Sequence, residues 1–308
     1  MQARFRKEPG FLFLIFTIMN SEEPKKLRLA IQKSGRLNED SIQLIKECGI
    51  HFNGRMDKLK SEAANFPIEI LYLRDDDIPG YVSDGVADIG IVGDNVVEEK
   101  EKIVERIEYL GFAKCRLSIA VPKAMDSFQP ADLNGYNIAT SYPKITRRYL
   151  ENNGIQANIH EISGSVEIAP SIGLAGAICD IVSSGSTLMT NGLKEVFTIY
   201  KSEAVLIGGE GLSNEKKLIL QDLLFRIRAV NKAKNNKYIM LNAPNSKLDK
   251  ICSILPGMKS PSILPLADSG WSSVHSVVQE DNFWAIIESL KEQGAQGILV
   301  LPIEKMIL

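Results

Sequence analysis

The sequence predicts an α/β fold made of two lobes followed by a smaller C-terminal domain. Short apolar runs alternate with amphipathic segments from Leu27 onward, and this alternation is typical of parallel sheets covered by helices. The length of 308 residues is enough for two or three domains. A composition of 44% hydrophobic and 24% charged residues, with a net charge of −2, belongs to an ordinary globular chain.

The first lobe is predicted from residues 25–112 together with residues 205–230. Strands are expected at residues 27–31, 68–73 and 88–92, where apolar side chains are concentrated. Helices are expected after the Gly35 turn, after the acidic run 75–77 and over residues 213–230. The acidic run supports a helix start, because carboxylates are favourable at helix N-termini.

The second lobe is predicted from residues 113–204. Its strands are expected at residues 115–121, 137–140, 157–162 and 177–182, and its helices over residues 143–150 and after the segment 164–167. A strand over residues 196–207 is predicted to cross back to the first lobe. Two lobes joined by crossing strands form a periplasmic-binding-protein-like core, in which ligands bind at the carboxyl ends of strands.

The last part of the chain, residues 231–308, predicts a separate domain. The lysine-rich residues 232–237 are interpreted as a linker. The elements after it follow the order β-α-β-β-α-β, which is that of the ferredoxin-like fold. From its residues alone, this domain is either an oligomerisation module or a sensor of a small ligand.

Residues 176–188 carry the clearest functional signal. A short apolar segment is followed by the small residues Ser-Ser-Gly-Ser-Thr at positions 183–187, which let an anion approach closely. Gly185 can adopt a positive φ, so that hydroxyl and backbone N–H groups converge on a phosphate. Asp180 lies near the strand end, where its carboxylate can accept hydrogen bonds from ribose hydroxyls. The pattern favours a sugar phosphate as ligand; a turn that binds nothing is the alternative.

Other features of the composition exclude several classes of function. No basic stripe indicates nucleic-acid binding. The four cysteines, at positions 48, 115, 179 and 252, lie among apolar residues, and we expect free thiols in a reducing compartment. The three histidines are scattered along the chain, so no protein-bound metal cluster is predicted.

Residues 1–24 are predicted to be a disordered extension. Basic residues precede an apolar run at positions 11–19, as in a signal peptide, but no small-residue cleavage site follows. The run is also too short to span a bilayer. Met19 is an alternative start. We therefore expect a cytoplasmic protein without a membrane partner.

Several short motifs resemble one known family. One motif runs from an acid through a glycine and an aspartate to a Ser-Gly-x-Thr loop. Its residues here are Glu167, Gly173, Asp180, Ser184, Gly185 and Thr187. Further motifs lie at residues 32–37, 74–80, 84–90, 139–143 and 301–306. Together they resemble the long-form ATP phosphoribosyltransferases, the first enzymes of histidine biosynthesis, over the chain from about Leu27 to its end.

The resemblance implies a displacement at an anomeric carbon. N1 of the ATP adenine attacks C1 of phosphoribosyl pyrophosphate, and pyrophosphate leaves. The protein must hold the two substrates in line and stabilise the departing charge. Mg²⁺ is the implied cofactor. Because this ion prefers oxygen ligands and keeps waters while it bridges substrate phosphates, no dedicated protein cage is expected.

The resemblance also implies roles for individual residues. Asp180 and Glu167 are the predicted catalytic residues, although Glu167 is nearly as well explained as a helix-start acid. Phosphoribosyl pyrophosphate is expected to contact Asp180, Ser183, Ser184, Gly185, Ser186 and Thr187. ATP or pyrophosphate is expected to contact Lys33, Arg36, Asp75, Asp94 and Tyr142.

The C-terminal domain is implied to bind histidine, the end product of the pathway, as a feedback inhibitor. The predicted lining residues are Asn242, Met258, Ser262 and Gly297. Relatives often carry Asp in place of Asn242, and this chain therefore lacks a carboxylate for the ligand's ammonium. A homo-oligomer, as dimer or hexamer, is expected. Two alternatives remain: a two-lobed solute-binding protein, and a non-catalytic regulatory paralogue.

Overall fold

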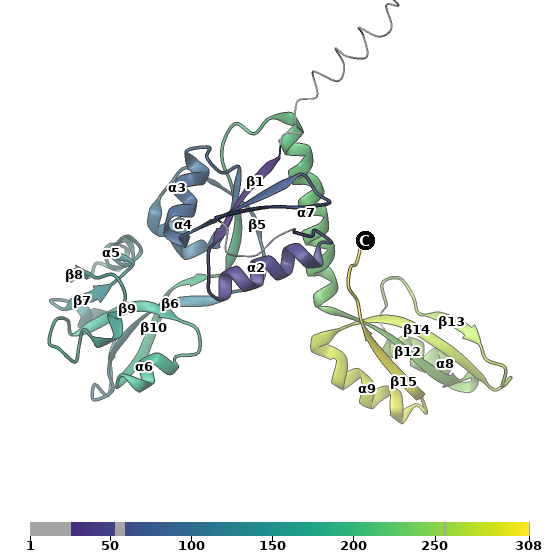
Figure 1. Cartoon of the computed structure of the whole chain (residues 1–308). Coiled ribbons are helices and arrows are strands. Elements are labelled where there is room, and N and C mark those ends of the chain that lie inside the picture. The colour runs from purple at the N-terminus through teal and green to yellow at the C-terminus, as the bar shows by residue number, and fades with distance from the viewer. Residues whose placement is uncertain (1–25, 53–58, 256, 308) are drawn as a thin grey trace, which may run out of the picture. The chain divides into compact units, whose positions relative to one another are not determined.

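The computed structural model describes residues 26–52, 59–255 and 257–307 (Figure 1). The predicted N-terminal extension, residues 1–24, lies outside the described residues. Two compact units are present, one of residues 26–41 and 50–221 and the other of residues 42–49 and 222–307. None of the described helices has the length and apolar character needed to cross a membrane.

The first lobe is built on a six-stranded sheet of order β2-β3-β1-β4-β11-β5. Its strands are β1 (Leu27–Gln32), β2 (Lys60–Glu62), β3 (Ile68–Leu73), β4 (Ile89–Gly93), β5 (Glu105–Tyr109) and β11 (Ala204–Gly208). Its helices are α2 (Arg36–Glu47), α3 (Ile78–Ser83), which follows the single 3-10 turn η1 (Asp75–Asp77), and α4 (Asp94–Lys100). Because β3 and β4 both run parallel to β1, the carboxyl ends of these three strands share one edge of the sheet.

The second lobe is built on a five-stranded sheet of order β10-β6-β9-β7-β8. Its strands are β6 (Cys115–Pro122), β7 (Asn137–Thr140), β8 (Asn158–Glu161), β9 (Ala177–Val182) and β10 (Leu193–Ser202). The helices are α5 (Pro143–Asn152) and α6 (Ser186–Thr190), with 3-10 turns η2 (Pro130–Leu133) and η3 (Val166–Ile168). β7 and β9 are parallel, whereas β6 runs antiparallel to both β9 and β10.

The C-terminal domain follows helix α7 (Asn214–Lys234). Its order is β12 (Asn236–Pro244), α8 (Leu248–Ile254), β13 (Ser262–Pro265), β14 (Trp271–Gln279), α9 (Phe283–Glu292) and β15 (Gln296–Pro302), with 3-10 turns η4 (Asn245–Lys247) and η5 (Glu280–Asn282). The antiparallel sheet has the order β13-β14-β12-β15, which confirms the predicted ferredoxin-like fold. Both helices pack on a core that includes Ile239, Leu241 and Val274.

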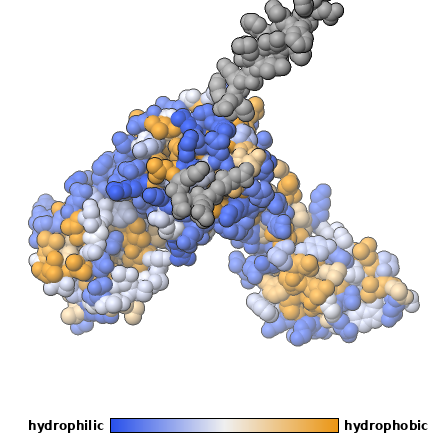
Figure 2. Space-filling model, in the orientation of Figure 1, coloured by the Kyte–Doolittle hydropathy of each residue, from blue (hydrophilic) through white to orange (hydrophobic). Residues whose placement is uncertain are grey.

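Hydrophobic side chains are also visible on the surface of this domain (Figure 2). Leu264, Leu299 and Leu301 are 55%, 52% and 46% exposed. By register, all three project from the sheet on the side opposite Leu241 and Val274, which the helices cover.

Three predicted elements are wrong in detail. The helix expected after residues 164–167 is only the short η3, because Ser165 has a φ of 51° before it and Pro170, which has no N–H, follows. The strand expected over residues 196–207 is two strands, β10 and β11, which belong to different sheets and are separated by Glu203. The linker expected at 232–237 is the end of α7 and the start of β12.

The correction at the linker has a simple physical cause. Lysine is a good helix former, and its charge is favourable in the last turn of a helix. Lys234 also forms an ion pair with Glu47 at 2.9 Å, on the last residue of α2. A lysine-rich segment therefore continues the helix in place of a flexible connection.

Candidate active site

The loop after β9 has the conformation that its sequence predicts. Gly185 adopts a φ of 82°, which favours glycine, and α6 begins at the next residue, Ser186. The Ser184 and Ser186 hydroxyl oxygens lie 3.0 Å apart, so both hydroxyls are gathered at the same turn. Thr187 is therefore the second residue of α6.

This loop and Glu167 enclose a cavity of about 280 Å³. Its lining comes from η3, β9, the loop and the first turns of α6, namely Glu167, Asp180, Ile181, Val182, Ser183, Ser184, Gly185, Thr187 and Leu188. The structure thus brings together both predicted catalytic residues and every predicted phosphoribosyl-binding residue except Ser186, whose hydroxyl contacts Ser184. Hydroxyl groups and carboxylates make the cavity suitable for a polyhydroxylated anion.

Asp180 is held half-buried beside Glu167. Its carboxylate accepts a hydrogen bond from the backbone N–H of Ile181 at 2.8 Å. Burial, with a further contribution from the negative charge of Glu167, raises the pKa of Asp180, while the Ile181 hydrogen bond partly opposes this shift. The negative charge of Glu167 therefore contributes to the raised pKa of Asp180, and perturbed carboxyl groups of this kind are frequent in functional sites.

Tyr142 lies at the start of α5, next to the carboxyl end of β7. Its backbone N–H donates to the Thr140 hydroxyl at 2.9 Å, and its carbonyl accepts from the Thr146 hydroxyl at 2.7 Å. Burial, followed by the charges of Asp180 and Asp75, raises the pKa of the Tyr142 phenol. Carboxylates from both lobes therefore act electrostatically on this phenol, since Asp75 follows β3 and Asp180 is on β9.

Glu99, which the sequence analysis did not single out, holds the first turn of α5. Only 7% of Glu99 is exposed, and its two carboxylate oxygens accept from the backbone N–H groups of Lys144 at 2.9 Å and Ile145 at 3.0 Å. No side chain at the start of α5 itself provides such a cap. An acid on α4 of the first lobe therefore fixes the helix turn that follows Tyr142.

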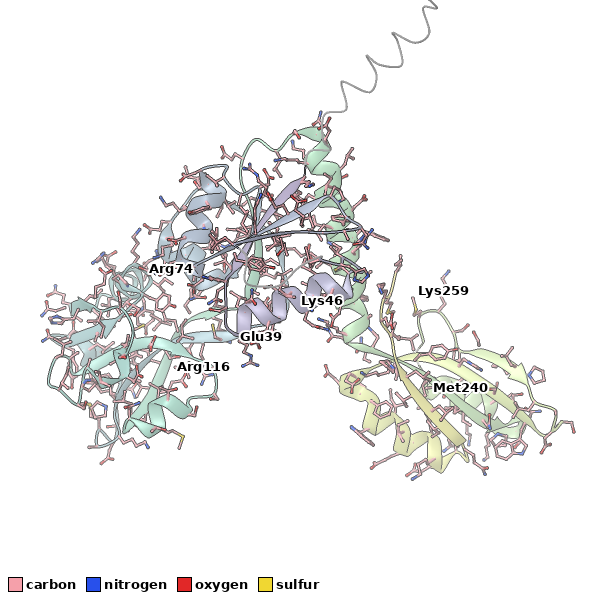
Figure 3. All side chains as sticks on the ribbon, in the orientation of Figure 1. Glu39, Lys46, Arg74, Arg116, Met240 and Lys259 are labelled. Carbon is pink, nitrogen blue, oxygen red and sulfur yellow. The ribbon has the colours of Figure 1, made fainter. Side chains whose placement is uncertain are left out.

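Arg116, which is labelled in Figure 3, connects residues 183–187 (the phosphate loop, named after its predicted ligand) to a second acid, Glu195. Its Nη1 donates to the Ser183 carbonyl at 3.2 Å, and its Nε donates to Glu195 at 2.5 Å. The Glu195 carboxylate also accepts from the Ser118 hydroxyl at 2.8 Å. The hydrogen bond from Arg116, partly opposed by burial, lowers the pKa of Glu195 and keeps this carboxylate charged.

Asp94 lines a neighbouring cavity of about 490 Å³, to which Ser183 also contributes. Asp94 is 6% exposed. Its Oδ1 accepts from Arg106 Nε at 2.6 Å and its Oδ2 accepts from the Tyr200 hydroxyl at 2.5 Å. Both oxygens are thus engaged by protein groups, and a role for Asp94 in contacting ATP or pyrophosphate stays a prediction.

Lys33 and Arg36 lie exposed on the turn between β1 and α2, where Gly35 has a φ of 91°. The backbone N–H of Lys33 donates to the Leu73 carbonyl at 2.7 Å, so this turn adjoins the start of the Asp75 segment. Neither cation lines the cavity beneath the phosphate loop. The structure therefore groups Lys33 with Asp75 at the first sheet's carboxyl edge, separately from Asp180.

The four residues predicted to bind histidine are only partly brought together. Asn242 on β12 and Gly297 on β15 are adjacent, and a Cβ added to Gly297 would lie 3.3 Å from Asn242 Nδ2. Ser262 lies across β14 from β12, on the same sheet face as Asn242 by register. Met258 is exposed in the turn before β13.

Sequence reasoning missed Arg116, Glu195 and Glu99 as supports of the site. A charged residue inside an apolar strand was a usable signal for Arg116, because burial of a charge requires a partner. The identity of that partner, 79 residues later, has no local signal. Among the described residues, no group of three or more His, Cys, Asp or Glu side chains could hold a metal ion.

The chain is similar to known proteins over most of its length. Residues 74–229 match the family model described as ATP phosphoribosyltransferase, and residues 233–305 match the model of the HisG C-terminal domain. The ATP phosphoribosyltransferase of Cytophaga hutchinsonii is 63% identical over 91% of this chain and 98% of its own length. That of Bacteroides thetaiotaomicron is 56% identical over 92% of this chain and 100% of its own.

A solved structure gives the same result for the fold. The ATP phosphoribosyl transferase (HisG:HisZ) complex of Thermotoga maritima contains a chain that is 30% identical to this one, with a TM-score of 0.56. The match covers 66% of this chain and 98% of that chain. The predicted α/β class and two-lobed core are confirmed, and this chain belongs to the ATP phosphoribosyltransferase family of enzymes.

Proposed function

We propose that this chain transfers the phosphoribosyl group of phosphoribosyl pyrophosphate to N1 of ATP, the first step of histidine biosynthesis. A C1–N1 bond forms while the bond from C1 to the pyrophosphate oxygen breaks, and pyrophosphate carries the electron pair away. The observation that carries the proposal is the cavity that Asp180, Glu167 and the phosphate loop line together. Its hydroxyl-rich end suits a 5′-phosphate, and its acidic end suits a ribose.

The proposed roles follow from these positions. Backbone N–H and hydroxyl groups of residues 183–187 bind the 5′-phosphate, and Asp180 accepts hydrogen bonds from the ribose hydroxyls. Tyr142 contacts the adenine from the start of α5. Lys33 and Arg36 attract the phosphates of ATP or the departing pyrophosphate, to which two exposed cations on a glycine-containing turn are suited.

Mg²⁺ is part of the proposal as a companion of the substrate. The oxygen donors of Asp180 and Glu167, which line one cavity, are of the type that this ion prefers, and it commonly retains waters while it binds phosphates. When bound with pyrophosphate it neutralises charge that develops on the leaving group. The chain's own part is to place the ribose and the adenine in line.

We also propose that histidine binds the C-terminal domain and inhibits the enzyme at a distance. Asn242 and Gly297 supply two adjacent lining positions, and Ser262 supplies a hydroxyl on the same sheet face. Inhibition requires that histidine prefer one global state over another. A homo-oligomer, as dimer or hexamer, provides such states, and a cytoplasmic location suits an enzyme that consumes ATP.

One assay tests the catalytic proposal. The purified full chain is mixed with ATP, phosphoribosyl pyrophosphate and Mg²⁺, and the ultraviolet absorbance of the N1-substituted adenine is followed together with pyrophosphate release. Both signals are expected to rise in equal amounts, and Asp180→Asn is expected to lose most of the rate. A folded wild-type chain that releases no pyrophosphate would overturn the proposal and favour a non-catalytic regulatory paralogue.

A further inference from the structure

We propose that Arg116 and Glu195 form a clamp that orients the phosphate loop before the ligand arrives. Arg116 is a positioning residue in this proposal, because it acts through the Ser183 carbonyl. The inference rests on the proposed function, in which residues 183–187 hold the 5′-phosphate of phosphoribosyl pyrophosphate. It assigns a role to an ion pair that lies outside the loop itself.

The sheet places Arg116 between the loop and its acid partner. On β6, Arg116 pairs with Val182 of β9 on one side and with Lys201 of β10 on the other. Its guanidinium donates twice to Glu195, from Nε and Nη2 at 2.5 Å each. Nη1 donates at 3.2 Å to the carbonyl of Ser183, the first residue of the loop.

The hydrogen bond to Ser183 has a geometric consequence for the next residue. A peptide group is planar and trans, so the Ser183 carbonyl and the Ser184 N–H point in opposite directions within one plane. When Arg116 fixes the carbonyl, it also directs the Ser184 N–H away from itself. The loop is thus organised without ligand, and less ordering is required on binding.

Glu195 is itself held in place by several donors. Its Oε1 accepts from the Ser118 hydroxyl at 2.8 Å and from the Thr198 hydroxyl at 3.4 Å. The guanidinium of Arg116 is planar and presents donors in a fixed fork, which lets it engage a carboxylate with two N–H groups and a carbonyl with a third. A lysine ammonium retains the charge but lacks this fixed fork.

The change in anion affinity in Glu195→Gln has opposite signs for a clamp and for a simple electrostatic effect. If Glu195 acted only as a nearby negative charge, Glu195→Gln would remove repulsion and tighten the binding of an anion. If Glu195 holds Arg116, the same change loosens the clamp and weakens binding. The direction of the change therefore separates the two roles.

The test measures binding of phosphoribosyl pyrophosphate by calorimetry in Glu195→Gln, Arg116→Lys and Arg116→Gln. We expect each variant to bind about tenfold more weakly, while the KM for ATP changes less than about twofold. Lys60→Gln serves as the matched control, because it removes another ion pair, Lys60 with Glu69 at 2.8 Å, from the sheet of the first lobe. The control is expected to bind as the wild type does.

Hydrogen exchange of the ligand-free protein provides a second readout that does not depend on activity. The backbone amides of residues 183–187 should exchange faster in Glu195→Gln than in wild type or Lys60→Gln. Tighter binding by Glu195→Gln, full binding by Arg116→Lys, or unchanged loop exchange in the variants would each overturn the clamp. Failure of the wild-type chain to bind phosphoribosyl pyrophosphate would overturn the proposed function, while faster loop exchange would still support the clamp.

Discussion

Glu99 Oε1 accepts a hydrogen bond from the backbone N–H of Lys144 at 2.9 Å, across 45 positions of sequence. Its other oxygen accepts from Ile145, so a single acid from the first lobe caps a helix of the second. Exposed ion pairs lie next to this contact. Lys144 and Arg148 each form an ion pair with Glu101, at 2.8 and 2.9 Å. We expect the Glu99 cap to contribute more to the stability of α5 than the exposed ion pairs do.

Removing the cap should destabilise α5 locally. In Glu99→Ala, the N–H groups of Lys144 and Ile145 lose their acceptor, and we expect the free energy of opening of α5 to fall by about 2 kcal/mol. Native-state hydrogen exchange of the α5 amides measures this change. Glu101→Gln is the control, with a much smaller expected loss, because exposed ion pairs contribute little. Equal effects in the two variants would contradict the assignment of Glu99 as the cap.

The phosphate loop should not tolerate a side chain at its glycine. Gly185→Val strains a left-handed residue and places bulk where the 5′-phosphate approaches. We expect phosphoribosyl pyrophosphate to bind at least about tenfold more weakly, or about 1.4 kcal/mol. Calorimetry on the folded variant provides the measurement.

Gly154→Val is the matched control for this loop variant. Gly154 has a φ of 66°, also in the left-handed region, with no atom within 4 Å of an added Cβ, and it lies after α5, away from the loop. We expect Gly154→Val to strain the backbone to a similar degree without weakening the binding of phosphoribosyl pyrophosphate. Equal loss in both variants would indicate a general effect of backbone strain.

The elevated pKa of Asp180 should appear in the pH dependence of activity. Ribose hydroxyls donate to the charged carboxylate, so activity should fall as the pH decreases through this raised pKa. In Glu167→Gln the neighbouring charge is absent, and the acidic limb of kcat/KM for phosphoribosyl pyrophosphate should move to lower pH. Part of the elevation should persist, because burial is its largest cause. Glu161→Gln changes an exposed acid at the end of β8 and should leave the limb unchanged; an unmoved limb in Glu167→Gln would refute the coupling.

The same carboxyl group should weaken the fold near neutral pH. Because the native Asp180 holds its proton more tightly than the unfolded chain does, unfolding releases that proton between the ordinary pKa of 3.8 and the raised value. Its contribution to the free energy of unfolding therefore decreases as the pH rises through this window. Relative to wild type, Asp180→Asn should be as stable or more stable near neutral pH, while its turnover falls. Thermal unfolding at several pH values measures the difference, and a strongly destabilised Asp180→Asn would indicate a structural acid.

Feedback inhibition is best tested with a point substitution. Removing residues 232–308 would cut α7 and delete the hydrogen bond from the Met306 N–H to the Ala229 carbonyl at 2.9 Å. Ser262→Trp instead fills the proposed histidine site and should abolish inhibition by histidine with little change in the uninhibited rate. Ser269→Trp, on an exposed turn of the same domain, should remain inhibited. Full inhibition of Ser262→Trp would place histidine elsewhere.

Much of the fold could be predicted because its strands are apolar and its turns are punctuated by glycine. The strands at residues 68–73, 137–140 and 177–182 were predicted with the observed bounds. The strands β2 and β5 were missed, since Lys60–Glu62 and Glu105–Tyr109 are rich in charged residues and lie at sheet edges. Edge strands need fewer apolar side chains, so periodicity does not reveal them.

The lining of the candidate site could be predicted where its residues are close in sequence. Asp180 and residues 183–187 lie within one short segment, and the structure places all of them except Ser186 around one cavity. The partners of Glu99 and Arg116 could not be predicted, because they are set by strand register and by the contact between α4 and α5. Hydrogen-bonding partners far apart in sequence become visible only when the sheets are assembled.

Two chain connections run between the lobes, and they are bonded to each other. Only Glu203 separates β10 from β11, and residues 110–114 separate β5 from β6. The two crossings are bonded to each other, by Leu110 N–H to the Ala204 carbonyl at 2.9 Å and by Ala204 N–H to the Phe112 carbonyl at 3.0 Å. These hydrogen bonds join the two connections side by side, like neighbouring strands of a short ribbon. Any rotation of one lobe relative to the other that separated the connections would have to break both hydrogen bonds.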